Sequence, residues 1–394
     1  MQYRTDPRSG NTLSVLGFGC MRFPSSALGR IDMKAAEALV LDAVEQGVNY
    51  FDTAYLYRGN EEAVGAILEE HNLRDRIFLA TKLPHANCTA YEDFDRYFDE
   101  QKERLCTDRI DYYLIHNIMS CEQWERLVAL GIERWIAEKK RTGEILRIGF
   151  SYHGSQGDFG RVLDAYDWDF CQIQYNYVNV NYQAGRAGLK RAAEKGLPVF
   201  VMEPLLGGKL TGGLPPQAAA ALKRADAQRT AAEWGLRWVW NHPEVTMVLS
   251  GMNEASQIAQ NVAAAERALP GAMTADELTV VDEVVRIFND INKVPCTGCN
   301  YCMPCPKGLN IPGCFSAYNA SYALGWYDGV KQYVLCSGGM GGDTRWASDC
   351  IECGACAKHC PQGIAIPEEL KRVRKRLQPA ILPPALKVGS RFLR

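Results

Sequence analysis

The stretch YFDTAYLYRGNEEAVGAILEEHNLRDRIFLATKL, residues 50–83, contains two short strand-forming segments with a helical segment between them. The strand-forming segments are YFDTA (50–54) and IFLATKL (77–83), and residues 60–70 between them have the composition of a helix. A strand followed by a helix and another strand is the repeating unit of parallel sheets. The stretch therefore predicts an α/β fold.

The same unit recurs along the first 290 residues. Eight apolar strand segments each precede a helical segment within about 260 residues, which matches the size and order of a (β/α)8 TIM barrel. A doubly wound sheet is the alternative, but no G-x-G-x-x-G follows the first strand. The other strand segments are 13–21, 111–117, 146–152, 170–176, 198–205 and 245–252, and the helical segments are 33–46, 60–70, 90–105, 122–141, 157–165, 184–195, 228–241 and 254–263.

The composition is that of a folded chain with nearly balanced charge. The 394 residues are 47% hydrophobic and 23% charged, and the formal net charge is -2. Nucleic acid is not an expected partner, because no overall positive field favours it. No window approaches the roughly 20 apolar residues of a membrane span and no signal peptide is evident, so we expect a cytoplasmic protein. Residues 371–394 hold eight cations and no acid, which predicts a basic C-terminal tail.

The cysteines indicate a second domain that begins near residue 290. Ten of the fifteen lie between residues 296 and 360, which in a reducing compartment indicates metal or redox chemistry. The later run has the C-x2-C-x2-C-x3-C-P spacing of bacterial ferredoxin cluster sites, at Cys350, Cys353, Cys356, Cys360 and Pro361. The earlier run has one residue fewer before its last cysteine, at Cys296, Cys299, Cys302 and Cys305.

Together the two runs resemble a two-cluster ferredoxin over roughly residues 293 to 370. The resemblance implies a small α+β ferredoxin-like domain, residues 291–370, with two 4Fe-4S clusters and crossed ligation. One cluster would be held by Cys296, Cys299, Cys302 and Cys360, and the other by Cys350, Cys353, Cys356 and Cys305. A zinc ribbon is the alternative, but it takes four ligands from two C-x2-C pairs, whereas each run here already contains four cysteines.

Polar residues end three successive strands of the predicted barrel. Asp52 ends the second strand, Lys82 the third and His116 the fourth, and Tyr57 follows Asp52 by five residues. The active site of such a barrel lies at the carboxyl ends of its strands, so these four side chains are expected at one mouth. Each alone has a structural explanation, such as an ion pair or a buried core histidine. Together they suit the movement of one proton.

The segments FDTAYLY, LATKL and YYLIH, in this order, resemble the aldo-keto reductase family, as do GFGCMRFP, RIGFS, QIQYN, EPLLGGKL and HPEVTMVLSGM. The resemblance spans residues 1–290 and implies hydride transfer between a nicotinamide cofactor and a small carbonyl or alcohol substrate. It makes Tyr57 the general acid, with Lys82 and Asp52 tuning it and His116 orienting the carbonyl. The chemistry agrees, because a nearby ammonium favours the phenolate and lowers a phenol pKa that is ordinarily near 10.

The resemblance also implies positions for NAD(H) or NADP(H). The aromatic residue that stacks on the nicotinamide is replaced by Met202, and the usual asparagine after the serine is Tyr152. From Gly251 to Ser256 the chain has no cation for a 2'-phosphate, which favours NAD(H). The implied contacts are Ser151 and Gln174 for the carboxamide, Gly207, Lys209 and Leu210 for the pyrophosphate, and Gln257 and Asn261 for the adenine.

Hydride transfer moves two electrons, whereas each 4Fe-4S cluster passes one, and no flavin fingerprint is evident in the sequence. Three interpretations remain open. In the first, substrate chemistry is linked to the clusters through a bound flavin or an external electron-transfer protein. In the second, the clusters only fix the added domain of a carbonyl reductase. In the third, a non-enzymatic electron carrier or redox sensor uses the barrel to bind nucleotide, and the four strand-end residues argue against it.

Overall fold

The computed structural model describes residues 1–26, 29–337 and 344–378. Contacts divide the chain into two compact units, Met1–Leu205 with Ala232–Thr274, and Leu206–Ala231 with Ala275–Arg394. The first unit contains the strands of the barrel, and the second contains the cysteine-rich segment. The predicted boundary near residue 290 falls at the end of helix α11 (Ala275–Ile291), which groups with the second unit.

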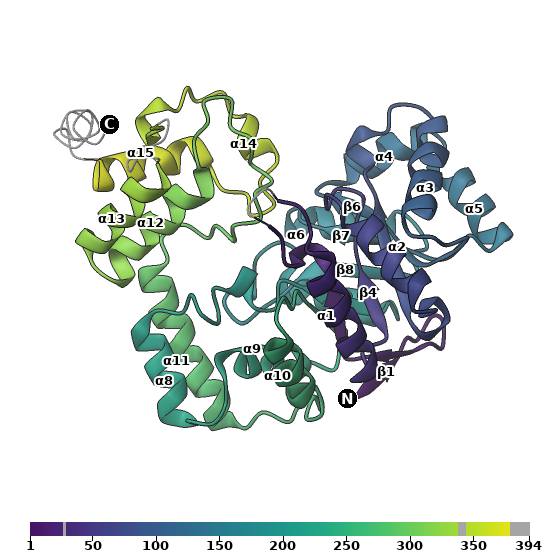
Figure 1. Cartoon of the computed structure of the whole chain (residues 1–394), viewed down its shortest axis with the longest axis horizontal. Coiled ribbons are helices and arrows are strands. Elements are labelled where there is room, and N and C mark those ends of the chain that lie inside the picture. Colours follow the sequence, from purple (N-terminus) through teal and green to yellow (C-terminus); the bar gives the residue numbers. More distant parts are fainter. Residues whose placement is uncertain (27–28, 338–343, 379–394) are drawn as a thin grey trace. The chain divides into compact units, whose positions relative to one another are not determined.

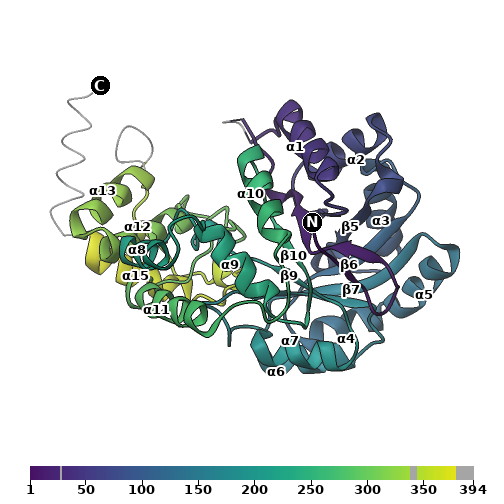
Figure 2. The same ribbon diagram turned by 90° about the horizontal axis from the view of Figure 1, so that it is seen from below.

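Eight parallel strands close into a barrel in the first unit (Figures 1 and 2), which confirms the predicted fold class. The doubly wound alternative is excluded because the last strand pairs with the first strand of the barrel, with Leu249 opposite Gly17. In barrel order the strands are β10 (Val245–Ser250), β3 (Leu16–Gly19), β4 (Tyr50–Asp52), β5 (Phe78–Leu83), β6 (Ile110–Ile118), β7 (Ile145–Tyr152), β8 (Phe170–Gln174) and β9 (Val199–Met202).

Most helices lie close to their predicted ranges, with three differences. The segment 122–141 forms two helices, α4 (Cys121–Ala129) and α5 (Ile132–Thr142), because Gly131 between them adopts a φ of 92°. The segment 13–21 is shared by β3 and by β2 (Thr12–Ser14), which turns back to pair with β1 (Tyr3–Thr5). Helices α8 (Pro216–Ala225) and α11 lie outside the predicted ranges. The matching helices are α1 (Met33–Glu45), α2 (Asn60–Glu70), α3 (Glu92–Arg104), α6 (Gln156–Asp164), α7 (Gly185–Glu194), α9 (Ala231–Trp240) and α10 (Ala255–Ala265).

Aromatic side chains fill the interior of the barrel. Tyr50, Tyr112, Phe170 and Phe200 are fully buried, and the ring centroids of contacting pairs among them lie 5.1 to 5.6 Å apart. Each aromatic contact of this kind contributes about 0.5–1.5 kcal/mol beyond the buried area. The barrel is therefore a packed core, and its chemistry must lie at an end.

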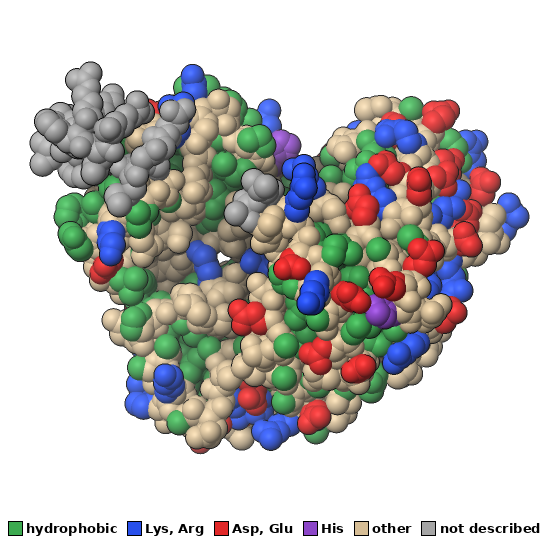
Figure 3. Space-filling model, in the orientation of Figure 1, with side chains coloured by type: hydrophobic (Ala, Val, Ile, Leu, Met, Phe, Trp, Pro, Cys, Tyr) green, Lys and Arg blue, Asp and Glu red, His purple; other side chains and the backbone are tan. Residues whose placement is uncertain are grey.

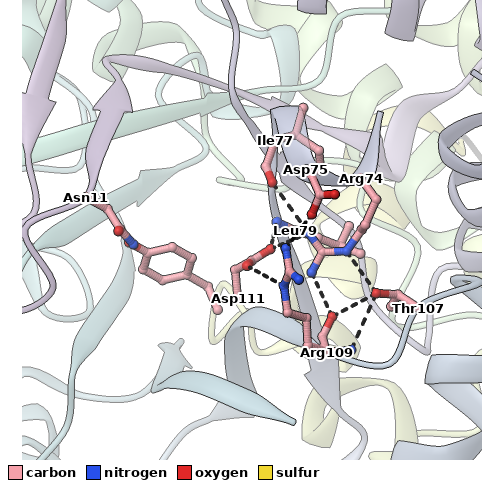
Figure 4. Close-up of polar contacts among 9 residues, drawn as sticks. Asn11, Arg74, Asp75, Ile77, Leu79, Thr107, Arg109 and Asp111 are labelled. Carbon is pink, nitrogen blue, oxygen red and sulfur yellow. Dashed lines mark hydrogen bonds and ion pairs between the residues drawn. The ribbon is translucent and has the colours of Figure 1, made fainter. Parts of the chain in front are cut away.

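Carboxylates bind backbone N–H groups at the amino ends of the strands. Asp111 Oδ2 accepts a hydrogen bond of 2.8 Å from the backbone nitrogen of Leu79 and lies 2.8 Å from the guanidinium of Arg74 (Figure 4). Asp169 makes the same kind of contact at β7 and β8, where it accepts a hydrogen bond of 2.7 Å from the backbone nitrogen of Ile148. A buried N–H left without a partner would cost about 1–3 kcal/mol. These contacts stabilise the end of the barrel opposite to the predicted site.

Acidic and basic side chains are interspersed over α2, α3 and α5 on the face drawn in Figure 3. Ion pairs join charged side chains of these helices, with Arg104 3.5 Å from Glu62 and Lys139 3.0 Å from Asp95. Charge is therefore balanced locally on this face. Among the described residues, no helix has both the length and the apolar character needed to span a bilayer.

Helices α12 (Ile311–Ala323), α13 (Trp326–Cys336) and α15 (Ile366–Leu377) lie together in the second unit (Figures 1 and 2). Their apolar side chains form one core with the cysteine loops. The described residues after α11 form helices and loops but no strand. Among these residues, the helices of the expected α+β domain therefore supply its packed core. Closely spaced cysteines, glycines and prolines interrupt these loops and leave no run long enough for strand pairing.

The boundary predicted at residue 370 lies inside α15. The helix continues to Leu377 because Val373 and Leu377 are buried at helical spacing from Leu370. The first residues of the predicted basic tail, 371–377, therefore belong to this helix. The remainder of that tail, 379–394, lies outside the described residues.

Candidate active site and cluster sites

Four side chains of the first unit meet at the carboxyl ends of β4, β5 and β6. Lys82 Nζ donates hydrogen bonds to Asp52 Oδ2 at 2.6 Å and to the carbonyl oxygen of Thr53 at 2.7 Å. The same ammonium lies 5.1 Å from the centroid of the Tyr57 ring. That ring stands edge-on to His116, with 5.8 Å between the centroids. The structure thus brings together all four residues that were singled out at the strand ends.

A buried polar network behind β5 holds Lys82 in place. Side chains alternate along a strand, so Lys82 faces the barrel interior while Thr81 faces the helices. Gln101 Nε2 donates to the carbonyl oxygen of Lys82 at 3.1 Å and to Glu61 Oε1 at 2.7 Å, and Thr81 Oγ1 donates to the same carboxylate oxygen at 2.5 Å. Burial raises the pKa of Glu61, while these hydrogen bonds oppose the shift. The network fixes the backbone that presents Lys82.

Burial sets the protonation of the site. It raises the pKa of Asp52, and Lys82 opposes this shift. It lowers the pKa of His116 well below the ordinary value, and Lys82, His153 and His85 lower it further. His116 is therefore neutral at pH 7 and offers one N–H donor and one lone pair. Within the described residues its Nδ1 is buried without a hydrogen-bond partner.

Two further histidines surround the site, and the sequence analysis missed both. His85 follows Lys82 by three residues, and His153 follows Ser151 by two. Burial lowers the pKa of each to about 4, and the nearby Arg126 contributes at His85. The sequence signal that could have identified them was their position just beyond the ends of β5 and β7, because the active site of such a barrel lies at the carboxyl ends of its strands.

We expect acid to destabilise the protein through these histidines. The pKa of about 4 for folded His85 and His153 lies below the unfolded value of about 6.5, so the unfolded chain binds the proton first. The free energy of unfolding should fall as the pH drops from about 6.5 to about 4, by about 1.4 kcal/mol per pH unit and histidine. Denaturant titrations of the wild type and His85→Gln at pH 7 and pH 5 measure this. The same pH dependence in both proteins would contradict it.

Strands β7, β8 and β9 present groups that fit a carboxamide. The side-chain nitrogen and oxygen of Gln174 are both buried without a partner among the described residues. Ser151 Oγ accepts a hydrogen bond of 2.7 Å from the backbone nitrogen of Asn117, which leaves its O–H to donate. Met202 lies opposite Gln174 in the β8–β9 register. A carboxamide needs both donors and acceptors, so these buried groups suit the nicotinamide amide.

Tyr152 faces away from this site. Its hydroxyl donates a hydrogen bond of 2.5 Å to the carbonyl oxygen of Ser155, and its ring packs edge-on against Phe159 at 5.0 Å. Both contacts lie in the helical layer outside the barrel. The side chain that stands at the position of the family's asparagine therefore does not replace it as a carboxamide contact.

Arg22 supplies a cation beside the loop that follows β10. This residue ends the short helix η1 (Cys20–Arg22), and a Cβ atom built on Gly251 would lie 3.0 Å from its Cδ atom. The sequence analysis missed Arg22 because it is remote from Gly251 in the chain and becomes its neighbour only through the pairing of β3 with β10. The absence of a cation from 251–256 therefore no longer favours NAD(H).

Gln257 and Asn261 lie on α10 and bind the loop before it. Gln257 Nε2 donates to Asn253 Oδ1 at 2.9 Å, and the backbone nitrogen of Asn253 donates to Gln257 Oε1 at 3.1 Å. Asn261 Nδ2 donates to Ser250 Oγ at 3.2 Å. These bonds fix the loop against the helix. The adenine contacts of the two residues stay a prediction.

Three of the expected nucleotide contacts belong to the second unit. Gly207 lies in η4 (Leu206–Gly208) with a φ of 64°, a left-handed conformation that favours glycine. Leu210 is buried, and burial lowers the pKa of Lys209 while the neighbouring Cys296 opposes the shift. Their contact with a pyrophosphate stays a prediction.

Two cavities in the second unit are each lined by four cysteines, and Ile311 lines both. The first contains Cys296, Cys299, Cys302 and Cys360. The second contains Cys305, Cys350, Cys353 and Cys356. The last cysteine of each run thus lies in the cavity of the other run, which is the grouping that crossed ligation requires.

The loops around the two middle cysteines share one backbone conformation. Gly298 and Asn300 flank Cys299 with φ values of 73° and 65°, and Glu352 and Gly354 flank Cys353 with values of 55° and 72°. Residues in the left-handed region are costly unless they are glycine, and such strain gathers at functional sites. Where successive residues alternate between right-handed and left-handed backbone conformations, their N–H groups point into a concave site that can bind an anion. Both loops are therefore suited to an anionic cluster.

The thiols of the first cavity interact electrostatically as a group. Burial, together with the neighbouring Cys296, Cys299 and Cys360, raises the pKa of Cys302 to about 12. Backbone N–H groups after Cys360 form hydrogen bonds to its sulfur. Bound iron removes the repulsion among thiolates, and four soft sulfur donors are the ligand set of a 4Fe-4S cluster. The residues present therefore fit that group.

Comparisons with known proteins agree with this description. Residues 15–284 match the model described as "Aldo/keto reductase family", and residues 295–365 match a "4Fe-4S dicluster domain". Fold and sites together define a TIM-barrel oxidoreductase with an appended iron–sulfur domain. The chain belongs to the aldo/keto reductase family.

Several relatives are similar to the barrel. L-galactose dehydrogenase of Arabidopsis thaliana is 28% identical over 311 residues, which cover 72% of this chain and 94% of the relative. The 6-dehydroglucose reductase of Novosphingobium aromaticivorans is 26% identical over 289 residues, which cover 66% and 90%. The solved structure of aldo-keto reductase AKR11C1 from Bacillus halodurans (holo form) has a TM-score of 0.59 at 25% identity, covering 72% of this chain and 96% of that one.

Proposed function

We propose that the barrel transfers hydride between NAD(H) or NADP(H) and a small carbonyl or alcohol substrate, and that the C-terminal domain binds two 4Fe-4S clusters. One observation carries the first part. The ammonium of Lys82, fixed by Asp52, lies beside the Tyr57 ring, which stands edge-on to the neutral His116. The two four-cysteine cavities support the second part.

The nicotinamide, when bound, supplies or accepts the hydride. Tyr57 donates its phenolic proton to the carbonyl oxygen during reduction and takes a proton from the alcohol during oxidation. The charge of Lys82 stabilises the phenolate that remains after donation. His116 donates a hydrogen bond to the same oxygen and orients the carbonyl, while Gln174 and Ser151 bind the carboxamide of the cofactor.

The buried ion pair favours an enzyme over a nucleotide-binding sensor. Lys82 is 1% exposed and Asp52 is 4% exposed. A buried ion pair gains little net stability over apolar residues of similar volume, because desolvation offsets the attraction. A barrel that only binds nucleotide has no use for such a charge beside a phenol. Proton transfer at Tyr57 gives the pair a role.

We infer that the second cavity is the exit for single electrons to an external electron-transfer protein. Cys353 is exposed, and its neighbour Ile351 is 57% exposed. A cluster held there would lie close to solvent, where a partner can approach it. The first cavity contains Cys360, which is buried.

Anaerobic mixing of the reconstituted protein with NADH or NADPH tests this function. We expect an aromatic aldehyde to be reduced, and the visible absorbance of the clusters to bleach when reduced nucleotide is added without aldehyde. Bleaching means that electrons pass between hydride chemistry and the clusters. Carbonyl reduction with an unchanged cluster spectrum would assign the clusters a structural role. Failure of both reactions would contradict the proposal.

Arg22→Gln is expected to weaken NADPH binding selectively. If the 2'-phosphate lies beside Gly251, the variant loses a charge-assisted hydrogen bond of about 1.5–3 kcal/mol, which is about 10- to 100-fold in the NADPH Kd. NADH, which lacks that phosphate, should bind as before. Fluorescence titration measures both, and Arg30→Gln, another exposed arginine of the same segment, is the control. Equal weakening of both nucleotides would count against this contact.

A further inference from the structure

Helices α12 and α13 form an antiparallel pair in which Cys314 faces Cys336. The helices approach closely at Ser321 and Gly329, where a Cβ atom on the glycine would lie 2.3 Å from the serine Cβ. Cys314 precedes Ser321 by seven residues, and Cys336 follows Gly329 by seven. Seven residues are about two helical turns. In an antiparallel pair, Cys314 and Cys336 therefore lie on the same helix faces as Ser321 and Gly329, two turns further along, and oppose each other.

The two thiols influence each other electrostatically. Cys336 raises the pKa of Cys314, and Cys314 lowers the pKa of Cys336. Cys314 is 1% exposed, and Cys336 is half-buried, with its sulfur 3.3 Å from the carbonyl oxygen of Tyr333. Both belong to the core of the unit, and the residues that line the two four-cysteine cavities do not include them. The pair is therefore separate from the proposed cluster ligands.

The pair lies next to both cavities. Ile311, about one helical turn before Cys314, lines both of them, and Phe315 lines the first. The neighbouring Cys336, burial and the nearby Cys305 all raise the pKa of Cys314. Because Cys305 lines the second cavity, the sulfur of Cys314 is an electrostatic neighbour of a proposed ligand.

We propose that Cys314 and Cys336 form a redox-active dithiol that exchanges two electrons with the clusters, an inference that rests on the proposed two 4Fe-4S clusters. On oxidation the two S–H bonds break, one S–S bond forms, two protons leave to solvent, and each oxidised cluster takes one electron. In the reverse direction each reduced cluster returns one electron, the S–S bond breaks, and two protons are taken up.

The number of electrons that each group transfers indicates what the Cys314–Cys336 pair could do alongside hydride transfer in the barrel. A hydride carries two electrons, a dithiol stores two, and each cluster passes one at a time. A disulfide also requires Cα atoms closer than about 7 Å, so the proposal requires α12 and α13 to lie as close at Cys314 and Cys336 as they do at Ser321 and Gly329. The small side chains at Ser321 and Gly329 produce this close packing.

A reductive titration of the holoprotein tests the proposal. Protein oxidised anaerobically with thionin is titrated with dithionite, the clusters are followed by EPR, and thiols are alkylated at each stage and located by mass spectrometry. We expect the wild type to take up about four electron equivalents, and Cys314→Ser or Cys336→Ser about two, with unchanged iron and sulfide. In the oxidised wild type, Cys314 and Cys336 should resist alkylation as a linked pair.

Cys171→Ser, at a buried barrel cysteine, is the matched control and should titrate like the wild type. Alkylation of both thiols after oxidation, with about two equivalents in every variant, would overturn the proposal. Loss of iron from the serine variants would identify the residues as cluster ligands and would also overturn it. A wild type without two reducible clusters would refute the proposed cluster content itself, and iron analysis separates that failure from a dithiol that does not titrate.

Discussion

Tyr57→Phe is expected to slow carbonyl reduction by about 10²- to 10⁴-fold while nucleotide affinity stays unchanged. The substitution removes one oxygen atom and keeps the ring that lies near both Lys82 and His116. Without the phenol no acid is placed to protonate the carbonyl oxygen, because Lys82 is already bonded to Asp52 and to the Thr53 carbonyl. Single-turnover reduction of an aromatic aldehyde measures the rate, and nucleotide fluorescence measures the affinity.

Tyr55→Phe is the matched control for this experiment. Tyr55 lies two residues earlier, its hydroxyl donates a hydrogen bond of 3.0 Å to Glu100 Oε2, and its ring packs edge-on against Tyr97 at 4.9 Å. The control loses a hydrogen bond from the same loop but no atom near His116, so its turnover should remain. Equal loss in both variants would mean that the loop, not the phenol, was damaged. Unchanged turnover in Tyr57→Phe would remove that residue from the mechanism.

The sequence predicted the barrel and its four strand-end residues because both depend on local order. In a parallel barrel every strand ends at the same mouth, so Asp52, Lys82 and His116 must converge once the strands are assigned. Arg22 and Gly251 are adjacent only because β3 pairs with β10, and no local pattern records that closure. The outward turn of Tyr152 likewise depends on its packing against the helical layer.

Long-range packing also explains what the cysteine spacing left open. The runs predicted clusters, but the resemblance to a ferredoxin, not the spacing, assigned Cys305 and Cys360 to opposite clusters. The facing of Cys314 and Cys336 depends on the approach of α12 to α13, and that approach depends on the small residue Gly329. Single positions of this kind carry no periodic signal.

Pairs of cysteine substitutions are expected to reveal crossed ligation. Cys302→Ala or Cys305→Ala alone should each remove one of two intact 4Fe-4S clusters. Cys305→Ala combined with Cys353→Ala should remove no more than either alone, because both line the second cavity. Cys302→Ala combined with Cys305→Ala should remove both clusters, although these residues are only three apart in the sequence, because they line different cavities.

Spin counting by EPR of the dithionite-reduced proteins measures the intact clusters, and a centre that has lost one iron does not count as intact. Cys106→Ala, at an exposed barrel cysteine, is the control and should keep both clusters. If each run instead held its own cluster, the two double variants would exchange results, since Cys302 and Cys305 would share one cluster while Cys305 and Cys353 would belong to two. The two arrangements therefore predict opposite results for the two double variants. The measurement does not require a known substrate.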